Sequence, residues 1–244
     1  MKTRVVPLVM VLILAALASA PELRAAGLGS SPESPGSGRQ PGTLEWEAGL
    51  IWWNSEYRMS GGGLDLQEDD AGDLGFRGAI WFPQHFGFVG QYLPTATGDV
   101  AAGAADVTYI SFDARYRLDT VSINNYFAIG AGWEWSDLRV SDVFGRTDGP
   151  RVLGEMRLGT RNFFAYGEYV YMWKMSRINV NDTVAPDLRN IRGDEYEFGG
   201  GYLLGDHLQL RLGYHQVEFR MDRADGTRHT SRSKGYLAGL VVVF

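Results

Sequence analysis

Apolar and polar side chains alternate along most of the chain after the first 42 residues. In the segment 44–53, for example, Trp46 and Leu50 alternate with Glu45 and Glu47. A period of two is that of a β-strand, because successive side chains of a strand point to opposite faces. No stretch of this part keeps an apolar period of 3.6 residues through three helical turns. The pattern therefore predicts an all-β protein.

Ten segments carry the alternation, with eight strands as the alternative count. They are 44–53, 73–82, 86–93, 109–118, 127–135, 150–160, 163–176, 195–204, 208–215 and 236–244. A tilted β-strand needs about 9–11 residues to cross a bilayer, and most of these segments are that long.

The connections between these segments alternate in length, which predicts an up-and-down topology. The short ones are 83–85, 119–122, 161–162 and 205–206, and the long ones are 59–72, 94–105, 138–149, 178–192 and 221–233. Long and short loops therefore lie at opposite ends of the sheet. An even strand count returns the C-terminus to the short-turn end, where the first strand begins.

The first 42 residues differ from the rest. Lys2 and Arg4 precede the apolar run 5–17, and small residues follow it. This order is typical of a cleavable secretory signal peptide, and we predict 1–18 as that peptide. Residues 19–42 are rich in Pro, Gly and Ser and predict a flexible segment. The domain that remains is 43–244.

The polar faces of the strands carry many charges, which bears on which face is inside. The set is Glu45, Glu47, Arg77, Asp113, Arg115, Arg117, Glu134, Glu155, Arg157, Glu168, Glu195, Glu197, Arg211 and His215. In a transmembrane barrel the apolar rows face lipid and the polar rows face the lumen. A soluble periplasmic barrel that binds a ligand would place its large apolar side chains inward. We predict the transmembrane arrangement, with a Glu/Arg network in the lumen, and the soluble barrel remains the alternative.

Aromatic residues on the apolar faces favour the same interpretation, because they gather at two heights. Those near the short-turn end are Trp46, Phe82, Phe86, Tyr116, Phe127, Phe163, Tyr202 and Phe244. Those near the long-loop end are Trp52, Tyr92, Trp133, Trp135, Tyr171, Trp173, Tyr196, Tyr214 and Tyr236. Aromatic rings prefer the two interfaces of a membrane, so these sets predict two belts around an aliphatic band.

Composition narrows the function classes. The chain has no cysteine, which excludes a disulfide scaffold, a thiolate metal site and a cysteine nucleophile. Its formal net charge of −6 argues against nucleic acid as a partner, because phosphate binding needs a basic surface. No residue set indicates a cofactor or a metal.

The C-terminal pattern Gly239-x-x-Val242-x-Phe244 resembles the terminal strand of bacterial outer-membrane proteins. In those proteins this strand is the signal that the barrel-assembly machinery recognises. Residues 43–244 resemble the small outer-membrane barrel superfamily of OmpA- and OmpX-like proteins, and ten strands are the number found in omptins and in the adhesin OpcA. The resemblance implies an outer-membrane location in a Gram-negative cell envelope. It also implies short periplasmic turns, longer extracellular loops, and the bilayer and lipopolysaccharide as partners.

Several functions remain open at this point. A barrel of this kind has a structural, a surface-interaction or a narrow, porin-like pore role for small solutes or ions. Glycines beside the charged positions leave room for long arginine side chains or for a thin water path, and the sequence does not choose between them.

We expect no enzyme, although two hydrolase patterns deserve mention as alternatives. His229-x-Ser231 resembles the His-x-Ser pair of the lipid A deacylase PagL, yet no acid follows His229. The adjacent Asp206 and His207 resemble the Asp-His pair of omptin proteases, yet they fall at the short-turn end.

Overall fold

The computed structural model describes residues 44–61, 64–83, 85–96, 105–122, 125–140, 143–160, 162–179, 188–205 and 207–244. The predicted signal peptide 1–18 and the segment 19–42 lie outside the described residues. Ten strands make up the described part: β1 (Glu45–Gly61), β2 (Leu64–Trp81), β3 (Phe86–Ala96), β4 (Ala105–Ser122), β5 (Asn125–Val140), β6 (Val143–Gly159), β7 (Phe163–Asn179), β8 (Leu188–Leu204), β9 (Leu208–Arg223) and β10 (Arg228–Val243). Within these ranges no helix is long and apolar enough to cross a membrane.

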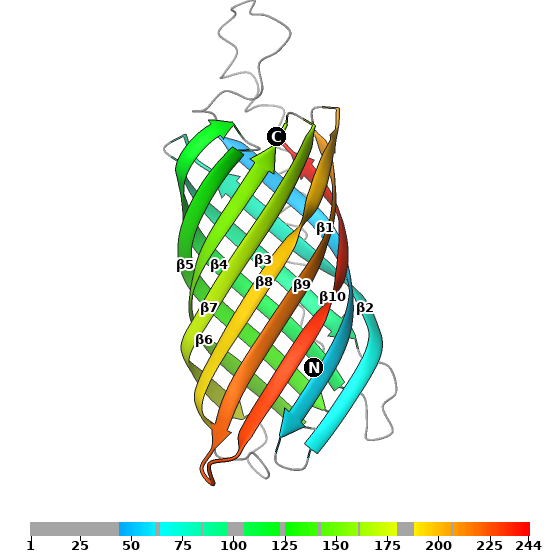
Figure 1. Ribbon diagram of the computed structural model, residues 1–244, viewed down its shortest axis with the longest axis vertical. Coiled ribbons are helices and arrows are strands. Elements are labelled where there is room, and N and C mark those ends of the chain that lie inside the picture. Colours follow the sequence, from blue (N-terminus) through cyan, green and yellow to red (C-terminus); the bar gives the residue numbers. More distant parts are fainter. Residues whose placement is uncertain are drawn as a thin grey trace, which may run out of the picture. The chain divides into compact units, whose positions relative to one another are not determined.

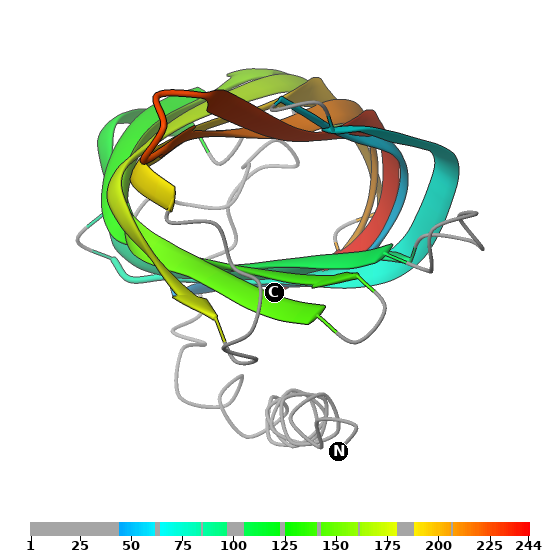
Figure 2. The same ribbon diagram turned by 90° about the horizontal axis from the view of Figure 1, so that it is seen from below.

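The ten strands close into one antiparallel barrel (Figure 1), and Figure 2 shows the ring that they form. Each strand pairs with its neighbours in sequence, and β1 pairs with β10 from Glu47 opposite Val243 to Ser60 opposite Thr230. The main chain of Trp46 also exchanges two hydrogen bonds with that of Phe244. The predicted up-and-down topology with ten strands is confirmed, and the alternative of eight strands is wrong.

The strands are longer than the sequence predicted, and most of the predicted long loops are shorter. β2 begins at Leu64, β6 at Val143 and β10 at Arg228, although 59–72, 138–149 and 221–233 were expected to be loops. Residues 119–122, expected to form a short turn, belong to β4 and contain register shifts against β5. One reason is that the apolar positions change face there: on β9 they pass from the outward Leu212 to the inward Val217 and Phe219. The alternation is therefore interrupted while the backbone pairing continues.

The strand length exceeds what a bilayer requires. β1 has 17 residues, and at about 3.3 Å per residue with a tilt of about 45° such a strand rises roughly 40 Å. The apolar band of a transmembrane barrel is only about 25 Å tall. The ends that carry the longer connections therefore extend well beyond that band.

The burial of side chains is the inverse of that in a soluble protein. On β9, Leu212 is 68% exposed, whereas the neighbouring Arg211 is only 3% exposed. The same alternation holds on β1, where Trp46 is 37% exposed and its neighbours Glu45 and Glu47 are each 7% exposed. Large apolar side chains point outward around the barrel, and the charged rows point inward.

The outward aromatic residues lie at the two heights that the sequence predicted. Near the short-turn end, Phe86 lies opposite Tyr116, and Phe163 lies opposite Tyr202. All eight aromatic residues predicted near the short-turn end are among the exposed large side chains. We call them the inner set, and those near the long-loop end the outer set. The two sets thus form an inner and an outer aromatic belt.

Local backbone irregularities interrupt the pairing at a few points. β7 and β8 carry register shifts at 172–175 and 189–192, and within them Lys174 and Asn190 both adopt a φ of 50°. A positive φ is uncommon outside glycine, and a β-bulge is one place where it occurs.

The turn between β9 and β10 is held by a side chain. Asp225 accepts a hydrogen bond of 2.8 Å from the main-chain N–H of Thr227, and Gly226 between them has a φ of 83°. This hydrogen bond lowers the pKa of the Asp225 carboxyl group.

We predict that a charge is tolerated on the outer wall only beyond the outer belt. Leu212→Arg places a guanidinium in the aliphatic band and should destabilise the folded barrel in vesicles by about 2–4 kcal/mol. Ser60→Arg, on the outward face of β1 beyond the belt and opposite Asp65, should change stability by less than about 1 kcal/mol. Urea unfolding in lipid vesicles measures both, and equal effects would contradict the lipid-facing assignment.

Candidate functional site: the charged lumen

The charged side chains singled out in the sequence lie inside the barrel. All fourteen are buried, with exposures from 0% to 7%: Glu45, Glu47, Arg77, Asp113, Arg115, Arg117, Glu134, Glu155, Arg157, Glu168, Glu195, Glu197, Arg211 and His215. Their contacts join strands that are not neighbours in the sheet, so they cross the interior. We call this set, together with Arg151, the lumen network.

Arg115 on β4 lies at the centre of the network. Its guanidinium donates hydrogen bonds of 2.6 Å to Glu155 and to Glu168, and one of 2.8 Å to Asp113. Glu168, on β7, also contacts Arg77 of β2 at 3.5 Å. A single guanidinium thus binds three carboxylates and ties three strands together across the lumen.

Arg151 on β6 is the second centre, and the sequence interpretation missed it. It contacts Asp113 and Glu195 at 3.1 Å each, Glu168 at 3.7 Å, and Glu134 by a short ion pair. The signal was present, because Arg151 shares the odd-numbered face of its strand with Glu155 and Arg157. Arg151 is the second residue of the predicted strand 150–160, and the sequence interpretation did not assign its side chain to the lumen or to the outer face.

At the end of the lumen near the short turns, arginines pair with carboxylates and pack on rings. Arg117 donates to Glu45 at 2.8 Å, and its guanidinium lies 3.8 Å from the ring centroid of Trp81. Glu47 contacts both Arg157, at 3.5 Å, and Arg211, at 3.2 Å. Cation–π contact adds to these pairs in a desolvated interior.

Arg157 and Arg211 also lie beside the ring of Phe164. The guanidinium of Arg157 is 4.5 Å from its centroid, and that of Arg211 is 5.9 Å away. Phe164 is completely buried, so its ring packs against both guanidinium groups inside the barrel.

His215 on β9 lies at the other side of the network. Its Nδ1 is 3.2 Å from Glu197 and its Nε2 is 3.8 Å from Glu195. The indole of Trp53 meets the imidazole edge-on, with a centroid distance of 4.8 Å. The histidine is therefore held in place by two carboxylates and a ring.

Among the described residues, the lumen network contains eight carboxylates and six arginines, all of them buried. An unpaired charge in such an interior costs several kcal/mol, so each group needs a partner. Single arginines pair with several carboxylates at once: Arg115 and Arg151 each form ion pairs with three or more of them. Carboxylates thus outnumber arginines in the lumen network.

Glycines on the inner faces make room for these large side chains. A Cβ at Gly130 would lie 3.0 Å from Cγ of Arg115, and one at Gly213 would lie 2.6 Å from the hydroxyl of Tyr166. A Cβ at Gly201 would overlap the ring of Phe164. At these three positions the space left by glycine is occupied by side chains.

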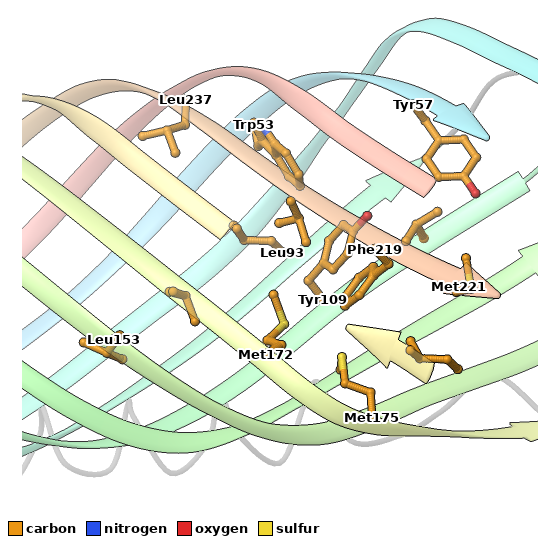
Figure 3. Packing of buried hydrophobic residues seen from close by; sticks show 14 of the residues in the cluster. Trp53, Tyr57, Leu93, Tyr109, Leu153, Met172, Met175, Phe219, Met221 and Leu237 are labelled. Carbon is orange, nitrogen blue, oxygen red and sulfur yellow. The ribbon is translucent and has the colours of Figure 1, made fainter. Parts of the chain in front are cut away.

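The lumen also contains an apolar cluster, which begins within the network, at Leu153 and at Val170 opposite Glu195, and extends toward the long-loop end. The buried cluster there comprises Ile51, Trp53, Tyr57, Leu93, Val107, Tyr109, Leu153, Val170, Met172, Met175, Ile191, Val217, Phe219, Met221 and Leu237. Figure 3 shows side chains of this cluster reaching toward one another from strands around the barrel. The rings of Tyr109 and Phe219 stack at 6.2 Å, and Tyr109 also lies 5.9 Å from Trp53.

The sequence interpretation did not predict this apolar cluster. Val217, Phe219 and Met221 continue the inward face of β9, which was predicted to end at 215. Extending the period of two into the expected loop would have revealed them.

The residues of the hydrolase patterns lie in different surroundings. His229 and Ser231 are buried and face the lumen from β10, and the Ser231 hydroxyl donates to Tyr57 at 3.3 Å. His207 lies in the β8–β9 connection, where its Nδ1 is 3.0 Å from the main-chain oxygen of Val243. Asp206 lies outside the described residues.

The residues of the predicted assembly signal lie on β10 and at its end. Phe244 is 36% exposed, and its ring stacks on that of His207 at 5.8 Å. Val242 faces outward with it, whereas Gly239 lies on the lumen face, opposite Ile51 and Arg211.

Comparison with known proteins gives only distant similarities. No family model matches the chain, and no curated protein matches its sequence. Among solved structures, Ail, the attachment invasion locus protein of Yersinia pestis, is similar with 11% identity and a TM-score of 0.32, over 82% of this chain and 98% of that one.

Two further solved structures are similar to the same degree. OprG, an outer membrane protein from Pseudomonas aeruginosa, has 11% identity and a TM-score of 0.35, over 85% and 98% of the two chains. The toluene transporter TodX of P. putida has 10% identity and a TM-score of 0.34, over 84% and 91%.

We predict that removing a central arginine is costly. Arg115→Met leaves three buried carboxylates without their shared partner and should lower the free energy of unfolding by about 3–5 kcal/mol. Adding Glu168→Gln should recover part of the loss, because it removes one of the uncompensated charges. Denaturant unfolding in detergent micelles or vesicles measures both changes.

Arg58→Met is the control, since Arg58 and Asp65 form an ion pair with side chains that are 50% and 64% exposed. Its loss should cost no more than about 1 kcal/mol. If Arg115→Met were as mild, the lumen would be hydrated rather than dry.

Proposed function

We propose that this protein is an integral outer-membrane barrel with a closed lumen, whose role is structural or lies in surface interaction. Its interior serves to hold the wall rigid, and its outer end presents the strands beyond the membrane. It is not an enzyme in this proposal, because the lumen network is a set of mutually paired charges.

The observation that carries this proposal is the pairing of charges across the lumen. Arg115 and Arg151 are each 1% exposed, and between them they contact carboxylates from β4, β5, β6, β7 and β8. Ions that crossed this layer would have to break several buried ion pairs. The apolar cluster extends the filled part of the lumen toward the long-loop end.

The membrane location is supported by the arrangement of the outer wall. Leu212, Phe198 and Leu74 are 68%, 55% and 55% exposed, which would be unfavourable in water over a continuous surface. The two aromatic belts enclose this apolar wall, as they do at membrane interfaces. The C-terminal pattern ending in Phe244 supports recognition by the barrel-assembly machinery, and the predicted signal peptide supports export.

The proposal predicts that the wild-type protein does not conduct in planar bilayers. The variant Arg151→Ala with Glu134→Ala removes one facing pair and should open a leak. That leak should prefer cations, because carboxylates exceed arginines in what remains of the network. Single-channel recording with asymmetric salt measures both the conductance and the selectivity.

A matched control removes an opposite-charge pair from the outer wall instead. Arg139 lies directly opposite Asp106 on the outward face, so replacing both with alanine should leave the barrel closed. Heat-modifiable migration in SDS gels verifies that each variant is folded. Regular conductance steps from the wild-type protein would contradict the closed lumen.

A further inference from the structure

The outer wall of β8, β9, β10 and β1 carries an unusual arrangement of cations just beyond the outer aromatic belt. Arg58 of β1 lies directly opposite Arg232 of β10, and Arg192 of β8 lies directly opposite Arg220 of β9. Lys234 lies two residues after Arg232 on β10, on the same face and closer to the membrane. We call these five residues the outer cation patch.

Like charges directly opposite each other on neighbouring strands destabilise a sheet. Two such arginine pairs in one patch therefore work against the stability of the barrel. An anion bound between them would remove the repulsion.

The carboxylates of this wall neutralise the patch only in part. Glu218 is shared, since it accepts hydrogen bonds of 2.8 Å from Arg220 and 2.9 Å from Arg232. Lys234 contacts Glu56 at 3.2 Å. Arg58 contacts Asp65 of β2 at 3.2 Å. The five cations of the patch therefore face four nearby carboxylates, which are Glu56, Asp65, Asp194 and Glu218.

The patch also remains accessible. The side chains of Arg58, Arg220, Arg232 and Lys234 are 50%, 41%, 43% and 36% exposed. Arg232 uses its Nε for Glu218, and the rest of its guanidinium fork is in a position to bind an outside group.

The opposite wall is built differently. There Arg139 lies opposite Asp106, and Arg146 lies opposite Asp137 with hydrogen bonds of 2.6 and 2.7 Å. Each of these arginines has an acid opposite it on one neighbouring strand and an apolar residue, Phe144 or Ile178, on the other. Arg232 also lies opposite an acid, Glu218 of β9, but Arg58 lies opposite it on the other side. The repulsive pairs on the β8–β1 wall are therefore not a general feature of the barrel rim.

Directly below the patch, on the membrane side, lies a platform of aromatic rings. Tyr214 is the centre, with ring distances of 6.2 Å to Tyr196, 5.5 Å to Phe198 and 5.7 Å to Tyr236. Tyr236 is 73% exposed and stands two residues after Lys234 on β10, closer to the membrane. A ligand that covers both features needs negative charges beside a face that packs on rings.

We propose that this wall binds a phosphorylated glycolipid of the outer leaflet, of the lipid A type. Its phosphates bind the outer cation patch, because arginine forks match phosphate geometry. Its sugar rings pack on the platform of Tyr196, Tyr214 and Tyr236, and its acyl chains follow the aliphatic wall at Leu212. A lipid fits better than a free anion, since the platform continues into the lipid-facing band. The inference rests on the membrane location proposed above.

Native mass spectrometry of the folded protein with bisphosphorylated lipid A tests the proposal. The wild-type protein should retain one lipid, and Arg58→Gln with Arg232→Gln should weaken binding by at least about tenfold, because charged hydrogen bonds to phosphate are lost. Tyr236→Leu should weaken binding too, by removing an exposed ring of the platform, and heat-modifiable migration in SDS gels verifies that this variant is folded. The matched control, Arg139→Gln with Arg146→Gln, removes two arginines from the opposite wall and should bind as the wild type does.

Three probes define the ligand chemistry. Dephosphorylated lipid A should bind at least about tenfold more weakly, and phosphatidylglycerol should not displace lipid A. Inorganic phosphate should not displace it either. Equal binding by the patch and control variants, or displacement by either competitor, would overturn the inference.

The two proposals fail separately. If the protein folds in vesicles without lipid A, shows heat-modifiable migration and does not conduct, the closed membrane barrel stands whatever the lipid result. If it does not insert at all, the proposed function falls, and the lipid site falls with it.

Discussion

Charges buried in a narrow interior must be paired, and that requirement governs this structure. Eight carboxylates and six arginines of the described residues are enclosed by the ten strands. The penalty for leaving one unpaired exceeds what most single contacts contribute. Arg115 and Arg151 resolve it by joining carboxylates from several strands, so the same contacts that neutralise the lumen also fix the strands relative to one another.

The rest of the barrel follows from placing charges inside. Because strand side chains alternate, the residues between the charged ones must face outward, and they are the Leu, Phe, Tyr and Trp that a membrane accepts. Glycines such as Gly130 and Gly213 lie where Arg115 and Tyr166 need room. The interior thus holds the lumen network and, extending from it toward the long-loop end, the apolar cluster around Trp53 and Tyr109.

Much of this could be predicted from the sequence, because the period of two survives wherever one face is apolar. The ten strands, the barrel and the inward face of Glu195 and Arg211 all follow from that alternation. The outer strand ends could not be predicted in the same way. On β10, outward residues such as Arg232 and inward residues such as Ser231 are both polar, so periodicity does not separate a strand from a loop. On β9 the apolar positions move from the outward to the inward face, which interrupts the alternation.

Which charged residues of the lumen network pair with one another could not be predicted from the sequence either. Alternation tells which side chains share the lumen, but the pairing of Arg77 with Glu168 depends on the shear of the closed sheet. Arg151 is the clearest example of what the sequence did not reveal. It is a centre of the network, but it lies at the end of the predicted strand 150–160. The apolar cluster was missed for the same reason, because it lies on the extended strand ends.

The most direct test uses the absence of cysteine from the chain, which allows single cysteines to be introduced along β9 and labelled with a fluorophore. Quenching by spin-labelled lipid acyl chains then reports which positions touch hydrocarbon. The account predicts strong quenching at positions 208, 210 and 212 and weak quenching at 209 and 213. Equal quenching at odd and even positions, or the reverse alternation, would contradict the assignment of charges to the lumen.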